Sequence, residues 1–159
     1  MILVLLGTQN NSFHRLLEEL DKLIIENIIK DKVIVQAGYT SYISNNMEIF
    51  SLIPKDKLSI LQEDADLIIT HGGVGSIITS IKKGKKVIAI PRKHEFNEHV
   101  NNHQEEIVEL FNKKGFIIGI NDVKELPMAL QRIPNFTPKK YQYNNSKMLK
   151  IIEDFIDKI

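Results

Sequence analysis

The residues best suited to chemistry lie in one short turn, His71-Gly72-Gly73-Val74-Gly75-Ser76. Glycine allows a tight turn and lets a phosphate approach the backbone closely. Residues 66–70 before the turn read as a buried strand and the residues after it as a helix, whose free N–H groups would face a ligand. Ser76 adds a hydroxyl donor, and His71 can hydrogen-bond a phosphate or a ribose. This pattern predicts a nucleotide-phosphate site.

The alternative is a strand-to-helix turn that binds nothing, but three glycines, a His and a Ser exceed what such a turn needs. Thr79 lies three residues after Ser76, on the same helix face as the phosphate end. Its hydroxyl could reach a ribose, and an ordinary exposed threonine is an equally good interpretation.

Several familiar enzyme motifs are missing. The turn has no Lys, as a Walker loop would require, and the first strand is followed by Gly7 alone rather than by a dinucleotide fingerprint. An ATPase and an NAD enzyme are therefore disfavoured. There is no G-x-S-x-G elbow for a serine hydrolase. Because the chain has no cysteine, disulfides, thiolate zinc sites and cysteine nucleophiles are excluded.

A second polar segment, residues 91–104, is rich in His, Asn and Gln. These side chains suit sugar hydroxyls, which both donate and accept, and Gln104 falls on an apolar helical stripe that points it inward or to a cleft edge. A solvated, well-capped helix start is the other interpretation. Glu95, His99 and His103 have a spacing that could ligate zinc on one helix face. No further ligand is evident, so a metal site is disfavoured.

The remaining pattern alternates short buried strands with helices, which predicts a doubly wound, mostly parallel α/β sheet. Ligands of such sheets bind at the carboxyl ends of the strands, so the loops after Leu6, Thr70 and Ile90 should share one edge. Ser12 and Asp122 are suited to cap helices. Strands are expected at residues 2–6, 33–36, 48–52, 66–70, 87–90 and 116–120, and helices at 13–24, 54–61, 76–83, 97–113, 122–131 and within 141–159.

The chain of 159 residues, 43% of them hydrophobic, suits a single domain spanning 1–159. A net charge of +1 gives no reason to expect nucleic-acid binding. The apolar start, residues 1–6, is too short for a signal peptide or a membrane span. We therefore expect a cytoplasmic protein that reaches a membrane only through a partner.

Three runs of residues together resemble the C-terminal, donor-binding half of glycosyltransferase family 28. They are the stretch from Ala65 to Ser76, then Gly84-Lys-Lys-Val-Ile-Ala-Ile-Pro91-Arg92, and Glu98-His99-Val-Asn-Asn102-His103-Gln104. With the first strand and Gly7-Thr8, the match covers most of residues 1 to about 120. The chain is most similar to the small subunit of bacterial two-component capsule and exopolysaccharide glycosyltransferases. It is also similar to the cytosolic subunit of the eukaryotic transferase that adds the second GlcNAc to a dolichol-linked sugar.

This resemblance implies a Rossmann-like half of a GT-B glycosyltransferase that binds a UDP-sugar and requires no cofactor or metal. The turn glycines with His71 and Ser76 would face the diphosphate, and Asn102 and Gln104 would hold the donor sugar. Arg92 is carried over from the small-subunit pattern without a defined role. The binding residues implied are Gly7, Thr8, Gln9, His71, Gly72, Gly73, Gly75, Ser76, Thr79, Arg92, Asn102 and Gln104.

The resemblance does not extend to an acceptor-binding domain, where full-length relatives carry the base, so no catalytic residue is named. It implies a membrane-anchored acceptor-binding partner subunit, a lipid-linked sugar acceptor, and a hexosyltransferase that is inactive alone. The product would be a capsule, an exopolysaccharide or a lipid-linked oligosaccharide. The helix expected within 141–159 would pack on that partner or on the chain's own sheet.

One departure from the family leaves a second hypothesis open. The family commonly has Glu at the position of Thr79, where it holds the ribose, and Thr cannot accept from two hydroxyls as a carboxylate does. The alternative function is therefore a non-catalytic enhancer that stabilises or activates a partner transferase. A free-standing nucleotide-binding or epimerase-like enzyme is weaker, because no catalytic pair is present.

Overall fold

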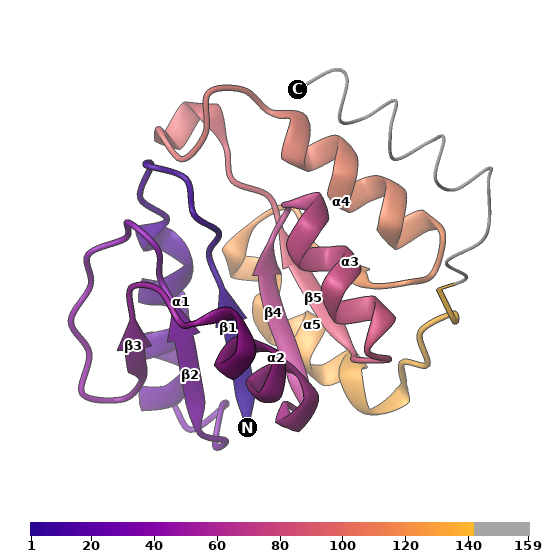
Figure 1. Cartoon of the computed structure of the whole chain (residues 1–159), viewed down its shortest axis with the longest axis horizontal. Helices are drawn as coiled ribbons and strands as arrows, with labels where there is room; N and C mark the ends of the chain where they lie inside the picture. The colour runs from indigo at the N-terminus through magenta and orange to yellow at the C-terminus, as the bar shows by residue number, and fades with distance from the viewer. Residues whose placement is uncertain (142–159) are drawn as a thin grey trace.

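The computed structural model describes residues 1–141 and shows one parallel sheet with helices on both faces (Figure 1). The strands pair in the order β3-β2-β1-β4-β5-β6, and every pairing is parallel. The strands are β1 (Ile2–Leu5), β2 (Val33–Gln36), β3 (Glu48–Phe50), β4 (Leu67–His71), β5 (Val87–Ile90) and β6 (Ile118–Gly119). The helices are α1 (His14–Ile25), α2 (Lys55–Asp64), α3 (Val74–Lys82), α4 (His103–Lys113) and α5 (Leu126–Arg132). Short 3-10 turns are η1 (His94–Phe96), η2 (Val123–Glu125) and η3 (Ile133–Asn135).

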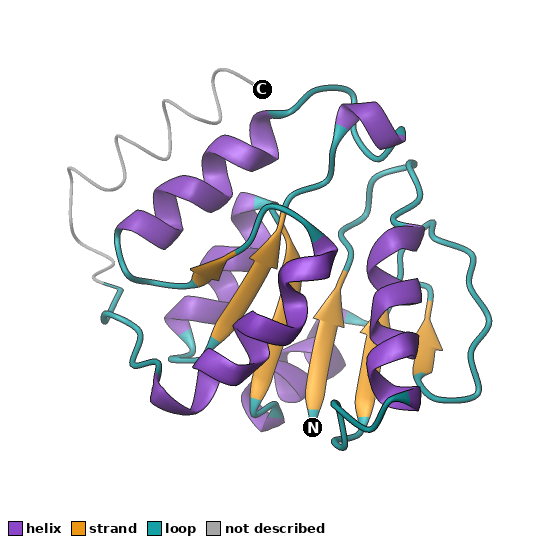
Figure 2. Ribbon diagram, turned by 180° about the vertical axis from the view of Figure 1, so that it is seen from behind, coloured by secondary structure: helices purple, strands orange, loops and turns teal. Residues whose placement is uncertain are grey.

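The strand order reverses between β1 and β4. The chain builds β1, β2 and β3 outward to one side and then returns to place β4 on the other side of β1. All arrowheads point to the same edge of the sheet (Figure 2), so the loops after β1, β4 and β5 are neighbours there. Such a reversal is where doubly wound sheets bind ligands. The predicted doubly wound parallel sheet is confirmed.

Both faces of the sheet are buried, which explains the unbroken apolar runs of the strands. Along β1, Ile2 and Val4 point into one core and Leu3 and Leu5 into the other. The first core is closed by α1 and α5, and the second by α3 and α4 with partly buried residues of α2. The core therefore fixes the relative positions of the strand ends.

Two predicted helix starts are wrong. Ser12 does not cap α1; Phe13 occupies that position, and its N–H donates to the Thr40 hydroxyl at 3.0 Å. The predicted helix at 97–113 begins only at His103. Asn97 has φ +58°, a left-handed conformation that Asn tolerates but that ends the preceding turn η1. Residues 97–102 therefore form a loop, and its side chains His99 and Asn102 are described with the candidate site below.

Other boundaries shift by a few residues. The strand predicted at 116–120 is reduced to Ile118–Gly119, and α3 begins at Val74 rather than at residue 76. Asp122 caps the 3-10 turn η2 rather than α5: its carboxylate accepts from the Lys124 N–H at 2.9 Å and the Glu125 side chain reciprocates, and α5 follows from Leu126. No helix of the described residues is long and apolar enough to cross a membrane. The helix predicted within 141–159 lies outside the described residues, apart from Tyr141.

Truncation of a core leucine should cost far more stability than truncation of an exposed isoleucine on the same helix. Leu17 on α1 is fully buried, whereas Ile25 at its end is 73% exposed. We expect Leu17→Ala to lower the free energy of unfolding by about 2–5 kcal/mol because it leaves a cavity. The control, Ile25→Ala, should change it by about 0.5 kcal/mol or less. Urea unfolding followed by circular dichroism measures both, and equal losses would contradict the described core.

Candidate functional site

The glycine-rich turn joins the end of β4 to the start of α3 at the point where the strand order reverses. His71 is the last residue of β4, Gly73 is the N-cap position of α3, and no side chain caps this helix. The first N–H groups of α3 therefore have no helical acceptor and face the carboxyl edge of the sheet. A helix N-terminus of this kind carries a partial positive charge that favours an anion.

The three glycines of the turn have different surroundings. A Cβ on Gly73 would lie 2.3 Å from the His71 ring, and one on Gly72 would lie 2.8 Å from Gln104 Cβ. Both positions are therefore fixed by packing inside the protein. A Cβ on Gly75 would meet nothing within 4 Å. Gly75 is the one turn glycine that borders open space, as a ligand would require.

His71 is held as a neutral hydrogen-bond donor. Its ring is 6% exposed, and burial together with the Arg92 charge lowers its pKa from 6.5 to about 3. Its Nδ1 lies 3.1 Å from Gln104 Nε2, an amide nitrogen that can only donate, so Nδ1 must accept. The proton therefore sits on Nε2, which lies 3.3 Å from the Ser76 hydroxyl.

Gln104 sets this arrangement. Its Oε1 accepts from the N–H of Gly72 at 3.0 Å and from the N–H of Arg92 at 2.9 Å. These two bonds fix which way the amide points, so that Nε2 faces His71. Gln104 is 3% exposed, and it joins the ends of β4 and β5 behind the turn. The predicted contact of Gln104 with a donor sugar remains a prediction, with the amide oxygen already bound to two N–H groups.

The loop after β1 lies against the same turn. A Cβ on Gly7, which has φ +79°, would be 2.7 Å from the His71 ring. The Gln9 amide lies 2.9 Å from His99 Nε2, while His99 Nδ1 accepts from the Asn101 N–H at 3.2 Å. Gly7 thus lies against the turn, whereas Thr8 and Gln9 are exposed and their contact with a ligand stays a prediction.

Two further predicted residues lie at the margin. The Thr79 hydroxyl bonds the carbonyls of Gly75 at 2.9 Å and Ser76 at 3.2 Å, and it accepts from Gln62 at 3.3 Å. Its single proton is therefore used within the helix. Exposed Asn102 accepts the His94 N–H at 2.9 Å and so holds η1 at the start of α4. The roles of Thr79 as a ribose contact and of Asn102 as a sugar contact stay predictions.

Sequence reasoning missed a buried ion pair beside the site. Glu98 is 2% exposed, and Arg15 binds its carboxylate through two hydrogen bonds of 2.7 and 2.8 Å. Arg15 and Glu98 are 83 positions apart. No local spacing links them, so the pair could not be found without the tertiary structure.

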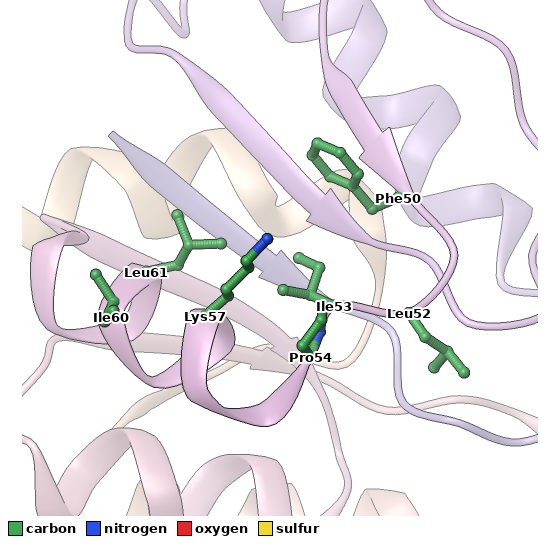
Figure 3. Close-up of a pocket in the computed structure, with 7 residues that line it drawn as sticks. All are labelled: Phe50, Leu52, Ile53, Pro54, Lys57, Ile60 and Leu61. Carbon is green, nitrogen blue, oxygen red and sulfur yellow. The ribbon is translucent and has the colours of Figure 1, made fainter.

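An apolar groove of about 440 Å³ lies between the end of β3 and α2. Figure 3 shows its lining residues: Phe50, Leu52, Ile53, Pro54, Lys57, Ile60 and Leu61. The Ile53 N–H donates to Gln36 Oε1 at 2.8 Å, which fixes the loop beside the groove. Lys57 is the one charged residue of this lining, so the groove has a different chemistry from the polar turn.

The histidines that could have suggested zinc have other neighbours. His99 is bonded as described above, and His103 lies 3.7 Å from Glu106. Within residues 1–141, no group of three or more His, Asp or Glu side chains is arranged as metal ligands would be.

The buried neutral His71 should make stability depend on pH. Its folded-state pKa of about 3 lies below the ordinary 6.5, so the unfolded chain binds the proton first as the pH falls. This contribution to stability is complete above pH 6.5 and is lost as the pH falls toward 3, amounting to about 2 kcal/mol between pH 7 and 5. Urea unfolding at both pH values should show a smaller loss for His71→Gln. The control His14→Gln, on exposed His14, should keep the wild-type loss; an unchanged loss in His71→Gln would refute the assignment.

Comparison with known proteins finds relatives in sequence and in fold. The chain is 26% identical over 118 residues to a Candida glabrata protein named UDP-N-acetylglucosamine transferase subunit ALG13, covering 74% of this chain and 57% of that one. The chain thus spans little more than half of that relative. The solution structure of ALG13 matches 95% of this chain and 93% of its own with a TM-score of 0.60 and 18% identity. The crystal structure of Acinetobacter baumannii MurG matches with a TM-score of 0.58 and 16% identity, over 98% of this chain and 49% of MurG.

At such identities the structural matches show a shared fold. The family model described as "Glycosyltransferase family 28 C-terminal domain" matches residues 1–159, the whole chain. The chain, with its buried histidine beside a helix N-terminus at the reversal point of the sheet, therefore belongs to the glycosyltransferase family 28 C-terminal domain family.

Proposed function

We propose that this domain is the donor-binding subunit of a UDP-sugar-dependent glycosyltransferase. The observation that carries the proposal is that the glycine-rich turn brings together a neutral histidine, a serine hydroxyl and the first N–H groups of α3. His71 Nε2 lies 3.3 Å from the Ser76 hydroxyl, and the neighbouring Gly75 borders open space. Donors without a bound carboxylate suit a diphosphate, and its charge grows as the sugar leaves.

The role of His71 in this proposal is electrostatic. A pKa near 3 leaves the ring neutral at physiological pH, where it is a poor base and an N–H donor. The domain would stabilise the leaving diphosphate with preorganised dipoles, and the base that activates the acceptor would belong to another polypeptide. No catalytic base is assigned to this chain.

The second half of the active site would come from a membrane-anchored, acceptor-binding subunit. Two facts support this: the curated relatives are named as transferase subunits, and this chain matches 49% of MurG. The same names favour UDP-N-acetylglucosamine as donor, for transfer to a lipid-linked sugar. The protein would act in the cytoplasm, at the membrane through its partner. Capsule or exopolysaccharide synthesis is the alternative pathway for such a subunit.

A non-catalytic enhancer is the second candidate, and Thr79 favours it. The Thr79 hydroxyl is bonded to helix carbonyls and to Gln62, so it offers a ribose less than a free carboxylate would. An enhancer would not bind UDP-sugars even with its partner present.

Calorimetric titration of UDP, UDP-N-acetylglucosamine and UDP-galactose into the purified chain tests the donor site. Loss of a hydrogen bond to a charged group costs about 1.5–3 kcal/mol, so His71→Ala should weaken UDP binding about 10- to 100-fold. Gly75→Ala should fold normally, because its Cβ meets open space, and should weaken UDP by crowding the phosphate. The control, His14→Ala, should bind as the wild type does.

Three other outcomes would contradict the donor-site proposal. Undiminished UDP binding in both turn variants would place the nucleotide outside the turn. Binding absent from the isolated chain and from its complex with the partner would favour the enhancer. Sugar transfer by the isolated chain would instead indicate a free-standing enzyme.

A further inference from the structure

Arg92 is the largest side chain that the fold hides completely. It follows β5 and has no exposed surface. Burial lowers its pKa to about 10, with the Glu98 carboxylate opposing that shift, so the guanidinium is still charged at neutral pH. Burying a charge costs free energy unless the charge is paired or its hydrogen bonds are satisfied.

The guanidinium binds backbone carbonyls from three places. Nη1 donates to Asn11 O at 2.7 Å and to Glu98 O at 3.0 Å, and Nη2 donates to Leu6 O. The ring of Phe13 lies under it, 5.2 Å from the guanidinium carbon. Its Nε has no partner among the described residues. One side chain thus joins the loop after β1 to the loop after β5.

Among residues 1–141, no carboxylate forms a salt bridge with Arg92. The nearby Glu98 carboxylate is bound by Arg15 at 2.7 and 2.8 Å and by the Lys93 N–H at 3.0 Å. Two arginines therefore share one buried carboxylate, which leaves an excess positive charge inside the protein. This charge helps to lower the pKa values of both His71 and His99.

The two loops joined by Arg92 lie on either side of the glycine-rich turn, since β1 and β5 are the two neighbours of β4. Other bonds connect the same loops: Asn11 Nδ2 donates to Asn97 O at 2.9 Å, and Gln9 contacts His99 at 2.9 Å. These contacts are exposed or partly buried, whereas the bonds of Arg92 to Leu6 and Glu98 are buried. Arg92 therefore forms the buried part of the connection between the two loops.

We infer that Arg92 is a positioning residue that holds the loops 7–11 and 93–99 together around the turn and places a buried positive charge behind a bound diphosphate. The planar guanidinium can bind three separate carbonyls at once, which the single ammonium of lysine cannot do with the same geometry. The identity of the ligand rests on the proposed function; the link between the loops does not.

Arg92→Met and Arg92→Lys test this inference by two measurements. Amide hydrogen exchange should show loss of protection in both loops of each variant, with core strands such as β1 unchanged. Calorimetry should show UDP affinity reduced about tenfold or more in Arg92→Met, while affinity for uncharged uridine changes less than about twofold. Arg92→Lys keeps the charge and should recover part of the UDP affinity. Arg132→Met, which removes an exposed charge on α5, is the control and should match the wild type.

Unchanged loop protection in both variants would overturn the inference. Equal losses of UDP and uridine affinity, with protection lost throughout the core, would also overturn it, because they indicate a general structural role. If Arg92→Met does not fold, exchange in Arg92→Lys decides alone. If the wild type does not bind UDP, the proposed function fails, and loop protection still decides whether Arg92 joins the loops.

Discussion

The side-chain amide of Gln104 is the group on which the arrangement of the site depends. It accepts from the N–H of Gly72 and the N–H of Arg92 and donates to His71. These bonds connect α4 to the ends of β4 and β5 and determine which nitrogen of His71 carries the proton. An amide can do this because it has acceptor and donor atoms fixed in one plane. A buried amide with partners on both ends stabilises one orientation of the turn rather than several.

Around this amide, the glycines serve packing as well as ligand access. Gly7, Gly72 and Gly73 leave the room that the His71 ring and the Gln104 side chain occupy, whereas Gly75 borders open space. The same turn is therefore tightly packed on its inner side and open on its outer side. Burial keeps the His71 ring neutral, and its Nε2 faces the Ser76 hydroxyl at 3.3 Å.

The charged side chains near the turn also lie beneath it, inside the protein. Glu98 is matched by Arg15, and Arg92 is surrounded by carbonyls, so the interior beneath the turn is positive without presenting a cation at the surface. Under the proposed function, fixed dipoles and a buried charge would need no rearrangement when a diphosphate binds or when its charge increases. A site of this kind favours binding and leaving-group stabilisation, which fits a chain to which no base is assigned.

The sequence by itself determined the parallel sheet, its alternation with helices and the place of the glycine-rich turn. Apolar runs and glycine positions are local signals, and both arise from burial and backbone sterics that act within a few residues. The strand predicted at 116–120 is reduced to Ile118–Gly119, and α4 starts at His103 rather than at residue 97. Before α4, Glu98 and His99 contact the distant residues Arg15 and Gln9, and these contacts override the local helical periodicity. Gln104 was predicted to point inward or to a cleft edge, and it is buried, but its partners were not predicted.

The tertiary structure was needed to find the proton position on His71, the pairing of Arg15 with Glu98 and the carbonyls bound by Arg92. Each joins residues far apart in the chain, 83 positions in the case of Arg15 and Glu98 and 86 for Arg92 and Leu6. Hydrogen bonds depend on distance and direction in space, and neither is encoded in residue spacing beyond a single helix or strand.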